Sequence, residues 1–183
     1  MQKKIIIGLV GGLAAGKGTI AQYAKEKYSA STHRFSTMLR DVLNRLYLNI
    51  SRENMQLLST ILRKNFGEDL MAKVIAKDVE ADTSQVVIVD GVRRFADIKY
   101  LRQIDGFILA RVVADVNTRY QRLTQRGENE DDKNKTLEQF VEDHKKEADL
   151  EIPAVMDEAD LEIDNNGNLD DLYSQLDKII NNS

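Results

Sequence analysis

The segment KIIIGLVGGLAAGKGT, residues 4–19, decides the fold class that the rest of the chain must fit. Its apolar run, residues 5–10, is short and continuous, which is typical of a buried strand. The glycines that follow predict a tight turn, and the helix-forming residues 20–28 predict a helix directly after it. We therefore expect a strand, a glycine-rich loop and a helix start in immediate succession.

The loop has the composition of a phosphate-binding site. Several backbone N–H groups can turn toward one anion only where few Cβ atoms obstruct them, and five of the ten glycines fall at positions 8, 11, 12, 16 and 18. The helix start adds a positive partial charge, Lys17 a full charge, and Thr19 a hydroxyl that can reach Mg²⁺. The residues expected to bind phosphate are Gly11, Ala14, Ala15, Gly16, Lys17, Gly18 and Thr19.

The spacing of this loop departs from the common pattern G-x-x-x-x-G-K-[ST]. Gly18 stands where a hydroxyl residue is usual, and Thr19 follows one position later. The alternative is an ordinary glycine-rich turn between a strand and a helix.

Length and composition favour one domain, residues 1–183, with a single core. The formal net charge of −4 argues against a general nucleic-acid binder, and the chain has no Cys for a disulfide or a thiolate metal site. Its two His, at positions 33 and 144, are far apart in the sequence, so we expect no His-based metal site. No apolar run is long enough for a membrane span, so we expect a cytoplasmic protein. Monomer and homodimer remain equally open.

A second strong pattern is Gln85–Gly91, where four consecutive β-favouring apolar residues precede Asp90. Such runs suit a parallel strand that is covered on both faces. Asp90 could cap the next helix, or it could supply the carboxylate that Mg²⁺ needs beside a phosphate loop. The presence of the loop favours Asp90 and Thr19 as the metal site.

Between these two strands the spacing of apolar residues predicts mostly helix. Ser36 and Thr37 can cap a helix that starts near Met38, a second helix runs from Ser51 to near Gly67, and a third covers residues 70–79. After Asp90 we expect a helix to about residue 103, a strand over 107–114 and a helix that ends at Arg126.

This last helix carries Arg119, Arg122 and Arg126 on one face, at spacings of three and four residues. Like charges so aligned repel one another. Either the acidic residues 128–132 pair with them, or they bind a polyanion such as the phosphates of a nucleotide.

The rest of the chain completes an alternation of strands and helices. In order, we expect a polar run over 128–135, a helix over 136–150, the single Pro153, a strand over 160–164, a turn over 165–168 and a helix over 169–180. The alternation predicts an α/β three-layer sandwich with a five-stranded parallel sheet. Ligands of such folds bind beyond the C-terminal ends of the strands.

These residues resemble the nucleoside monophosphate kinase group of P-loop kinases, adenylate kinase and its relatives. Residues 11–19 are similar to its G-x-P-G-x-G-K-G-T loop, with Leu13 in place of the Pro and Ala14 in place of the middle Gly. Residues 36–40 resemble S-T-G-D-x-L-R shortened by two, and residues 90–94 resemble D-G-F-P-R. Arg122 and Arg126 match an R-x-x-x-R pair at the start of the lid.

The resemblance implies a P-loop NTPase fold of the nucleotide-kinase type, with a helical acceptor part over about 36–81 and a short lid over about 122–136. Residues 63–69 and 164–172 look closer to dephospho-coenzyme A kinases and deoxynucleotide kinases. It implies Arg40, Arg63 and Arg94 on the acceptor, Arg122 on the base of ATP, and Asn165 or Asn166 lining that base. It also implies catalytic roles for Lys17, Arg94 and Arg126.

We therefore expect an ATP- and Mg²⁺-dependent kinase that acts on a small phosphate-bearing acceptor, most simply a nucleoside monophosphate. Transfer to an alcohol, as in dephospho-coenzyme A, is an alternative and would require a carboxylate base. A slow NTPase switch is another, but the GTP-type motif N-K-x-D is missing and residues 132–135 read D-K-N-K. A binding domain that has lost its chemistry fits poorly with Lys17, Thr19 and Asp90.

Overall fold

Five parallel strands form one sheet in the computed structural model, which describes residues 4–126, 135–143 and 150–182, without the side chains of Arg52, Arg126 and Asp143. Their order across the sheet is β2-β3-β1-β4-β5. The bounds are β1 (Ile5–Val10), β2 (Ser31–Arg34), β3 (Val86–Val92), β4 (Phe107–Val113) and β5 (Leu161–Asp164). The predicted five-stranded parallel sheet is confirmed.

The central strand β1 lies between β3 and β4, so the chain changes direction across the sheet at this strand. Leu9 pairs with Asp90 of β3, and Val10 pairs with Arg111 of β4. The register of β1 with β3 shifts after Leu9, next to Gly91, whose φ is 89°. The glycine-rich loop therefore leaves the sheet between the ends of β3 and β4, where ligands of open α/β sheets bind.

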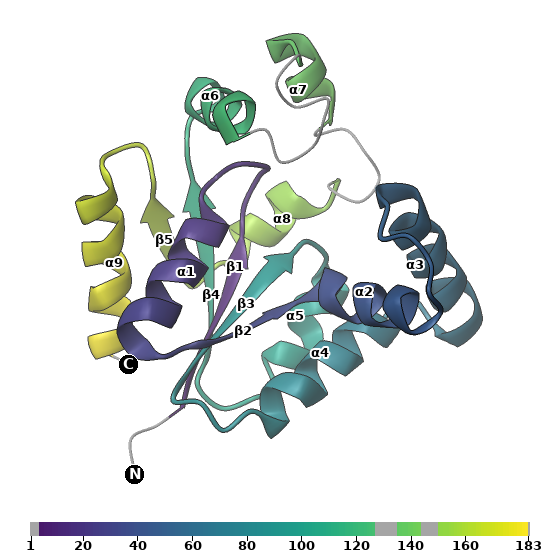
Figure 1. Cartoon of the computed structure of the whole chain (residues 1–183). Coiled ribbons are helices and arrows are strands. Elements are labelled where there is room, and N and C mark those ends of the chain that lie inside the picture. The colour runs from purple at the N-terminus through teal and green to yellow at the C-terminus, as the bar shows by residue number, and fades with distance from the viewer. Residues whose placement is uncertain (1–3, 127–134, 144–149, 183) are drawn as a thin grey trace.

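Helices cover both faces of the sheet and give three layers (Figure 1). On one face, α1 (Lys17–Tyr28) and α9 (Leu169–Asn181) pack through Ile20, Ala24, Leu172 and Leu176. On the other face, α4 (Leu70–Ala81), α5 (Phe95–Leu101) and α8 (Ile152–Asp157) share a second core with α2 (Phe35–Arg45). The apolar residues of β1 alternate between the two cores, with Ile6 and Val10 in one and Ile7 and Leu9 in the other.

Three further helices of the described ranges lie beyond the C-terminal ends of the strands (Figure 1). They are α3 (Arg52–Phe66), α6 (Val116–Arg126) and α7 (Leu137–Asp143). The predicted helix from Ser51 is present, and Ser51 caps it, because its hydroxyl accepts a hydrogen bond from the Asn54 N–H at 3.1 Å. None of the helices in the described ranges combines the length and the hydrophobicity that a membrane span requires.

Two local predictions differ from the structure. Helix α2 begins at Phe35, directly after β2, so Ser36 and Thr37 lie inside its first turn and do not cap it. No helix was predicted around Pro153, but Pro153 occupies the first turn of α8, where its missing N–H costs nothing. The helix expected over 136–150 is described only as α7, and residues 144–149 lie outside the described ranges.

Candidate active site

The loop between β1 and α1 has the backbone of an anion-binding turn. Ala14 and Gly16 both have positive φ, at 59° and 103°. Lys17 opens α1, and its ammonium donates hydrogen bonds to the carbonyls of Gly11 at 2.6 Å and Gly12 at 3.0 Å. The lysine is therefore folded back over the loop, with its charge beside the N-terminus of α1.

Steric constraints fix two of the loop glycines. A Cβ on Gly11 would lie 2.5 Å from the carbonyl oxygen of Val112 in β4, and a Cβ on Gly16 would lie 2.0 Å from the amide nitrogen of Asn165. Gly11 is thus needed for close contact with the sheet, and Gly16 for contact with the β5–α9 turn. Neither reason could be read from the sequence, because both partners are distant in the chain.

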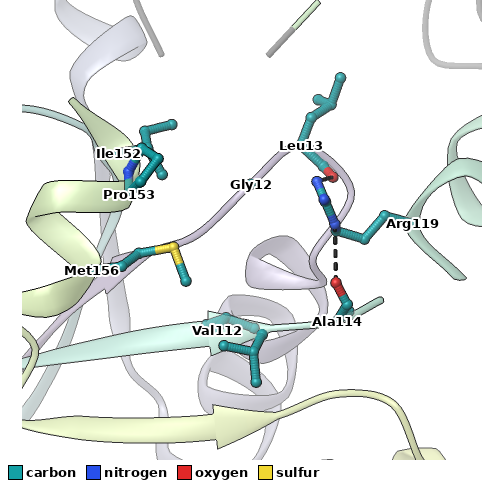
Figure 2. Close-up of a pocket in the computed structure, with 9 residues that line it drawn as sticks. Gly12, Leu13, Val112, Ala114, Arg119, Ile152, Pro153 and Met156 are labelled. Carbon is teal, nitrogen blue, oxygen red and sulfur yellow. Dashed lines mark hydrogen bonds between the residues drawn. The ribbon is translucent and has the colours of Figure 1, made fainter. Parts of the chain in front are cut away.

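Arg119 of α6 also supports the loop from outside. Its Nε donates to the Ala114 carbonyl at 3.0 Å and its Nη1 to the Leu13 carbonyl at 3.3 Å (Figure 2). The guanidinium lies 5.5 Å from the ring centre of Phe140 in α7, and burial lowers the pKa of Arg119. Arg119 therefore connects the phosphate loop, the end of β4 and α7.

A pocket of about 210 Å³ opens beside Gly12 and Leu13 on the α8 side of the loop (Figure 2). Its side-chain walls are mostly apolar, and Arg119 adds the polar part. The lining consists of Gly12, Leu13, Val112, Val113, Ala114, Arg119, Ile152, Pro153 and Met156. Sequence analysis did not identify the residues that α8 contributes to this pocket.

Asp90 lies near the C-terminal end of β3, as predicted, and pairs with Leu9 of the neighbouring strand β1 just before the loop. Its carboxylate pairs with the guanidinium of Arg34 at 3.0 Å, and Arg34 also lies close to Gly18 at the start of α1. Thr19 is exposed in the first turn of that helix. No sequence motif indicated Arg34, which is the last residue of the short edge strand β2.

Among the described residues, no group of three or more His, Cys, Asp or Glu could enclose a metal ion. Mg²⁺ at a phosphate loop does not need such a group, since it keeps waters and phosphate oxygens and takes one or two protein oxygens. The hydroxyl of Thr19 and the carboxylate of Asp90 have the hard oxygen donors that suit this ion.

Arg63 and Arg94, which were both assigned to the acceptor, are brought together on one carboxylate. Glu68 Oε2 lies 3.9 Å from Arg63 and 3.7 Å from Arg94. The arginine side chains are only 15% and 23% exposed, whereas Glu68 is 74% exposed. Burial and the neighbouring Arg94 charge lower the pKa of Arg63. Arg40 is exposed on α2 and has no described contact with this pair.

Two acidic residues that sequence analysis missed hold the Arg94 segment in place. Asp97, which is 5% exposed, accepts hydrogen bonds from the N–H groups of Arg93 and Arg94, each at 3.0 Å. Burial raises the pKa of Asp97, and these N–H groups with the nearby arginines oppose the shift. Glu151 accepts from the Phe95 N–H at 3.0 Å, immediately before the pocket residue Ile152. An acidic residue three positions into a helix is the signal that could have revealed Asp97.

The remaining predicted residues fall into two groups. Arg122 contacts Asn165, which is almost fully buried below the loop. The Arg126 side chain and residues 127–134, which make up most of the expected lid, lie outside the described residues.

The parallel sheet, the loop and Lys17 together define a P-loop protein of the kinase-like type. A family model described as "AAA domain" matches residues 10–141, more than two thirds of the chain, and the chain belongs to this family. A UPF0200 protein of Methanocaldococcus jannaschii is 29% identical over 178 residues, with 96% of this chain and 89% of that protein covered. A UPF0200 protein of Staphylothermus marinus is 28% identical over 93% of this chain and 88% of its own.

Solved structures agree on the fold. Shikimate kinase from Acinetobacter baumannii, in complex with shikimate, has a TM-score of 0.61 at 16% identity and covers 99% of this chain and 95% of its own. An uncharacterized protein from Eubacterium ventriosum has a TM-score of 0.63 at 14% identity, with 99% and 100% covered. These likenesses confirm a P-loop kinase-like α/β fold.

Proposed function

We propose that this chain is an ATP- and Mg²⁺-dependent phosphotransferase that acts on a small anionic acceptor. One observation carries the proposal: the same edge of the sheet holds a phosphate loop with Lys17 and, apart from it, two largely buried arginines that face a single carboxylate. The loop with Lys17 suits the phosphates of the donor, and the pair Arg63 and Arg94 suits an anionic acceptor. A nucleotide switch needs only the loop.

The donor phosphates would lie on the loop N–H groups and Lys17, with Mg²⁺ held by Thr19 and Asp90. The ion would neutralise charge on the transferring phosphoryl group. Transfer of this kind requires in-line positioning and charge neutralisation more than covalent chemistry. Arg122 and Arg126 would act from the lid, residues 122–136, and closure would exclude the water that hydrolyses ATP.

The acceptor would place its anionic group between Arg63 and Arg94, where Glu68 now lies. Glu68 is too far from either guanidinium for a hydrogen bond, so a phosphate or carboxylate can replace it at little cost. Arg40 would approach from α2, within the acceptor part over 36–81. A nucleoside monophosphate is our first candidate because its phosphate is both the group recognised and the nucleophile.

An anionic alcohol is the second candidate, and the pocket beside Leu13 favours it. Ile152, Pro153 and Met156 give this pocket an apolar wall that suits the uncharged body of an acceptor better than a second dianion. The structural likeness to shikimate kinase, a protein solved with shikimate, is consistent with such an acceptor.

A coupled ADP-release assay with MgATP tests the proposal directly. The panel consists of AMP, CMP, UMP, GMP, the four deoxynucleoside monophosphates, dephospho-coenzyme A and shikimate. We expect one of these acceptors to raise ADP formation well above the acceptor-free rate. Slow hydrolysis of ATP at the same rate with every acceptor would instead favour a nucleotide switch.

A further inference from the structure

Asn165 is a polar residue that is 3% exposed, at the start of the turn between β5 and α9. We propose that Asn165 is a positioning residue of the phosphate loop, which aims a loop N–H at the bound phosphates and connects the loop to α6 through Arg122. This inference rests on the proposed function, because it concerns how the donor site is held in shape.

The first step is the bond between the side chain and the loop. Asn165 Nδ2 donates to the carbonyl of Ala15 at 2.8 Å. The peptide between Ala15 and Gly16 is trans, so its C=O and N–H point in opposite directions. When Asn165 holds the carbonyl of Ala15, the N–H of Gly16 must point away from Asn165, toward the open side of the loop.

The second step is the fit between Asn165 and Gly16. A Cβ on Gly16 would lie 2.0 Å from Asn165 Nδ2, so the amide fills the space that the missing side chain leaves. The positive φ of Gly16 and the position of the amide therefore depend on each other.

The third step links this contact to α6 and β4. Arg122 Nη2 donates to the Asn165 carbonyl at 3.0 Å and lies 3.4 Å from its side-chain oxygen. The backbone N–H of Asn165 donates to Val113 at the end of β4 at 2.8 Å. Arg122 Nη1 is buried and has no hydrogen-bond partner among the residues that the structure describes. The side-chain amide of Asn165 thus donates to the Ala15 carbonyl through Nδ2 and, at the same time, offers its oxygen to the guanidinium of Arg122.

This role differs from the one that the family resemblance implies, in which Asn165 lines the base of ATP. A base contact changes the affinity for ATP and leaves the affinity for a phosphate chain without a base untouched. A positioning contact below the loop changes both affinities by the same factor. Inorganic tripolyphosphate, which has no base or ribose, therefore distinguishes the two roles.

The experiment compares Asn165→Ala with the wild-type chain by isothermal titration with MgATP and with magnesium tripolyphosphate. Loss of one buried hydrogen bond predicts a fall of about tenfold in both affinities. Asn165→Leu, which keeps the volume but removes the donor, is the second variant should the alanine variant fail to fold. Asn168→Ala is the matched control, because Asn168 caps α9 through the Asp171 N–H in the same turn. This control should lose thermal stability but keep both affinities.

A fall in MgATP affinity with unchanged tripolyphosphate affinity would overturn the proposal in favour of a base contact. Unchanged affinity for both ligands would overturn it as well, and would leave Asn165 as a packing residue. If the wild-type chain binds neither ligand, the proposed function fails, and that outcome is distinct from both of the others.

Discussion

At the scale of single residues, Gly16 is the position with the least freedom in the loop. Its φ of 103° disfavours any side chain, and a Cβ there would also collide with Asn165. Gly91 offers a matched comparison, because its φ is 89° and a Cβ there would meet nothing within 4 Å. The difference between alanine substitutions at the two glycines therefore isolates the collision.

We predict that Gly91→Ala lowers the free energy of unfolding by about 1 kcal/mol, the cost of a left-handed conformation. Gly16→Ala should cost about 2 kcal/mol more, since a well-packed contact must open to admit the methyl group. Urea denaturation of both variants provides the measurement. Equal losses would show that Asn165 does not pack tightly against the loop.

Arg94 and Arg93 provide a second residue-scale test, because they are adjacent but differ in environment. Arg94 is largely buried beside Arg63 and Glu68, whereas Arg93 is exposed. With the acceptor found by the ADP-release assay, Arg94→Ala should reduce kcat/KM for that acceptor by about 10- to 100-fold, the effect of losing a charged hydrogen bond. The affinity for ATP should change little.

Arg93→Ala is the control and should leave kcat/KM within about twofold, as surface substitutions usually do. If Arg94→Ala weakens ATP binding and spares the acceptor, then Arg94 belongs to the donor site and our division of the two anion sites is wrong.

The chemistry of single residues could be predicted from the sequence only where a local motif carries it. Lys17 and Thr19 stand out because a strand, a glycine run and a helix start surround them. Glu68 and Glu151 do not, because their contacts with Arg94 and Phe95 form only when distant segments meet. Asp97 differs, since its contact with the Arg94 N–H is local to the helix start. Arg119 stood out because of its place on a charged helix face, and Asn165 because of the family resemblance. Only the structure shows that both side chains donate to carbonyls of the loop.

At the scale of elements, the continuous apolar runs predicted β1, β3 and β4, because parallel strands are buried on both faces. The start of α2 was predicted three residues too late, since β2 continues into the helix without a capping side chain. Helix α8, which has Pro153 in its first turn, was not predicted. The first error concerns an element boundary and the second a short helix, and tertiary packing determines both more than local preference does.

A partly buried polar contact joins the edge strand β2 to Asp82 at the C-terminal end of α4, and it gives a prediction about pH. His33 Nε2 lies 2.7 Å from the carboxylate of Asp82, and the N–H of Ser84 donates to the same carboxylate at 2.8 Å. Burial alone would raise the pKa of Asp82, but these partners and Ser31 outweigh it and hold the pKa well below the ordinary 3.8.

A carboxyl group whose pKa is lower in the folded chain stabilises the fold above its unfolded pKa and loses that contribution as the pH falls. Asp82→Asn should therefore lower the free energy of unfolding by about 2 kcal/mol at pH 7, the effect of losing hydrogen bonds to a charged group. The difference from wild type should shrink below about pH 4, where the carboxyl of the unfolded chain becomes protonated. Urea denaturation of both proteins at several pH values measures this difference in unfolding free energy. A difference that stays constant down to pH 2 would contradict this account.

At the scale of the whole molecule, the order β2-β3-β1-β4-β5 brings all five strand ends to one edge. Five features that span most of the chain lie at or near the C-terminal ends of the strands there: Arg34, Asp90, the phosphate loop, Ala114 and Asn165. The alternation of strands and helices predicted this convergence. The arrangement of the helices over residues 35–81, which sets the acceptor, could not be predicted because no local pattern fixes how they pack.

The central claim is that this edge transfers a phosphoryl group between two separately bound anions. It is tested most directly by phosphorus-31 NMR of MgATP incubated with the acceptor from the ADP-release assay, with the wild-type chain and with Lys17→Ala. We predict that the wild-type chain forms a new phosphorylated acceptor in amounts equal to the ADP, and that Lys17→Ala forms neither while still unfolding cooperatively. Release of inorganic phosphate in place of a phosphorylated acceptor, or unchanged turnover in Lys17→Ala, would contradict the account.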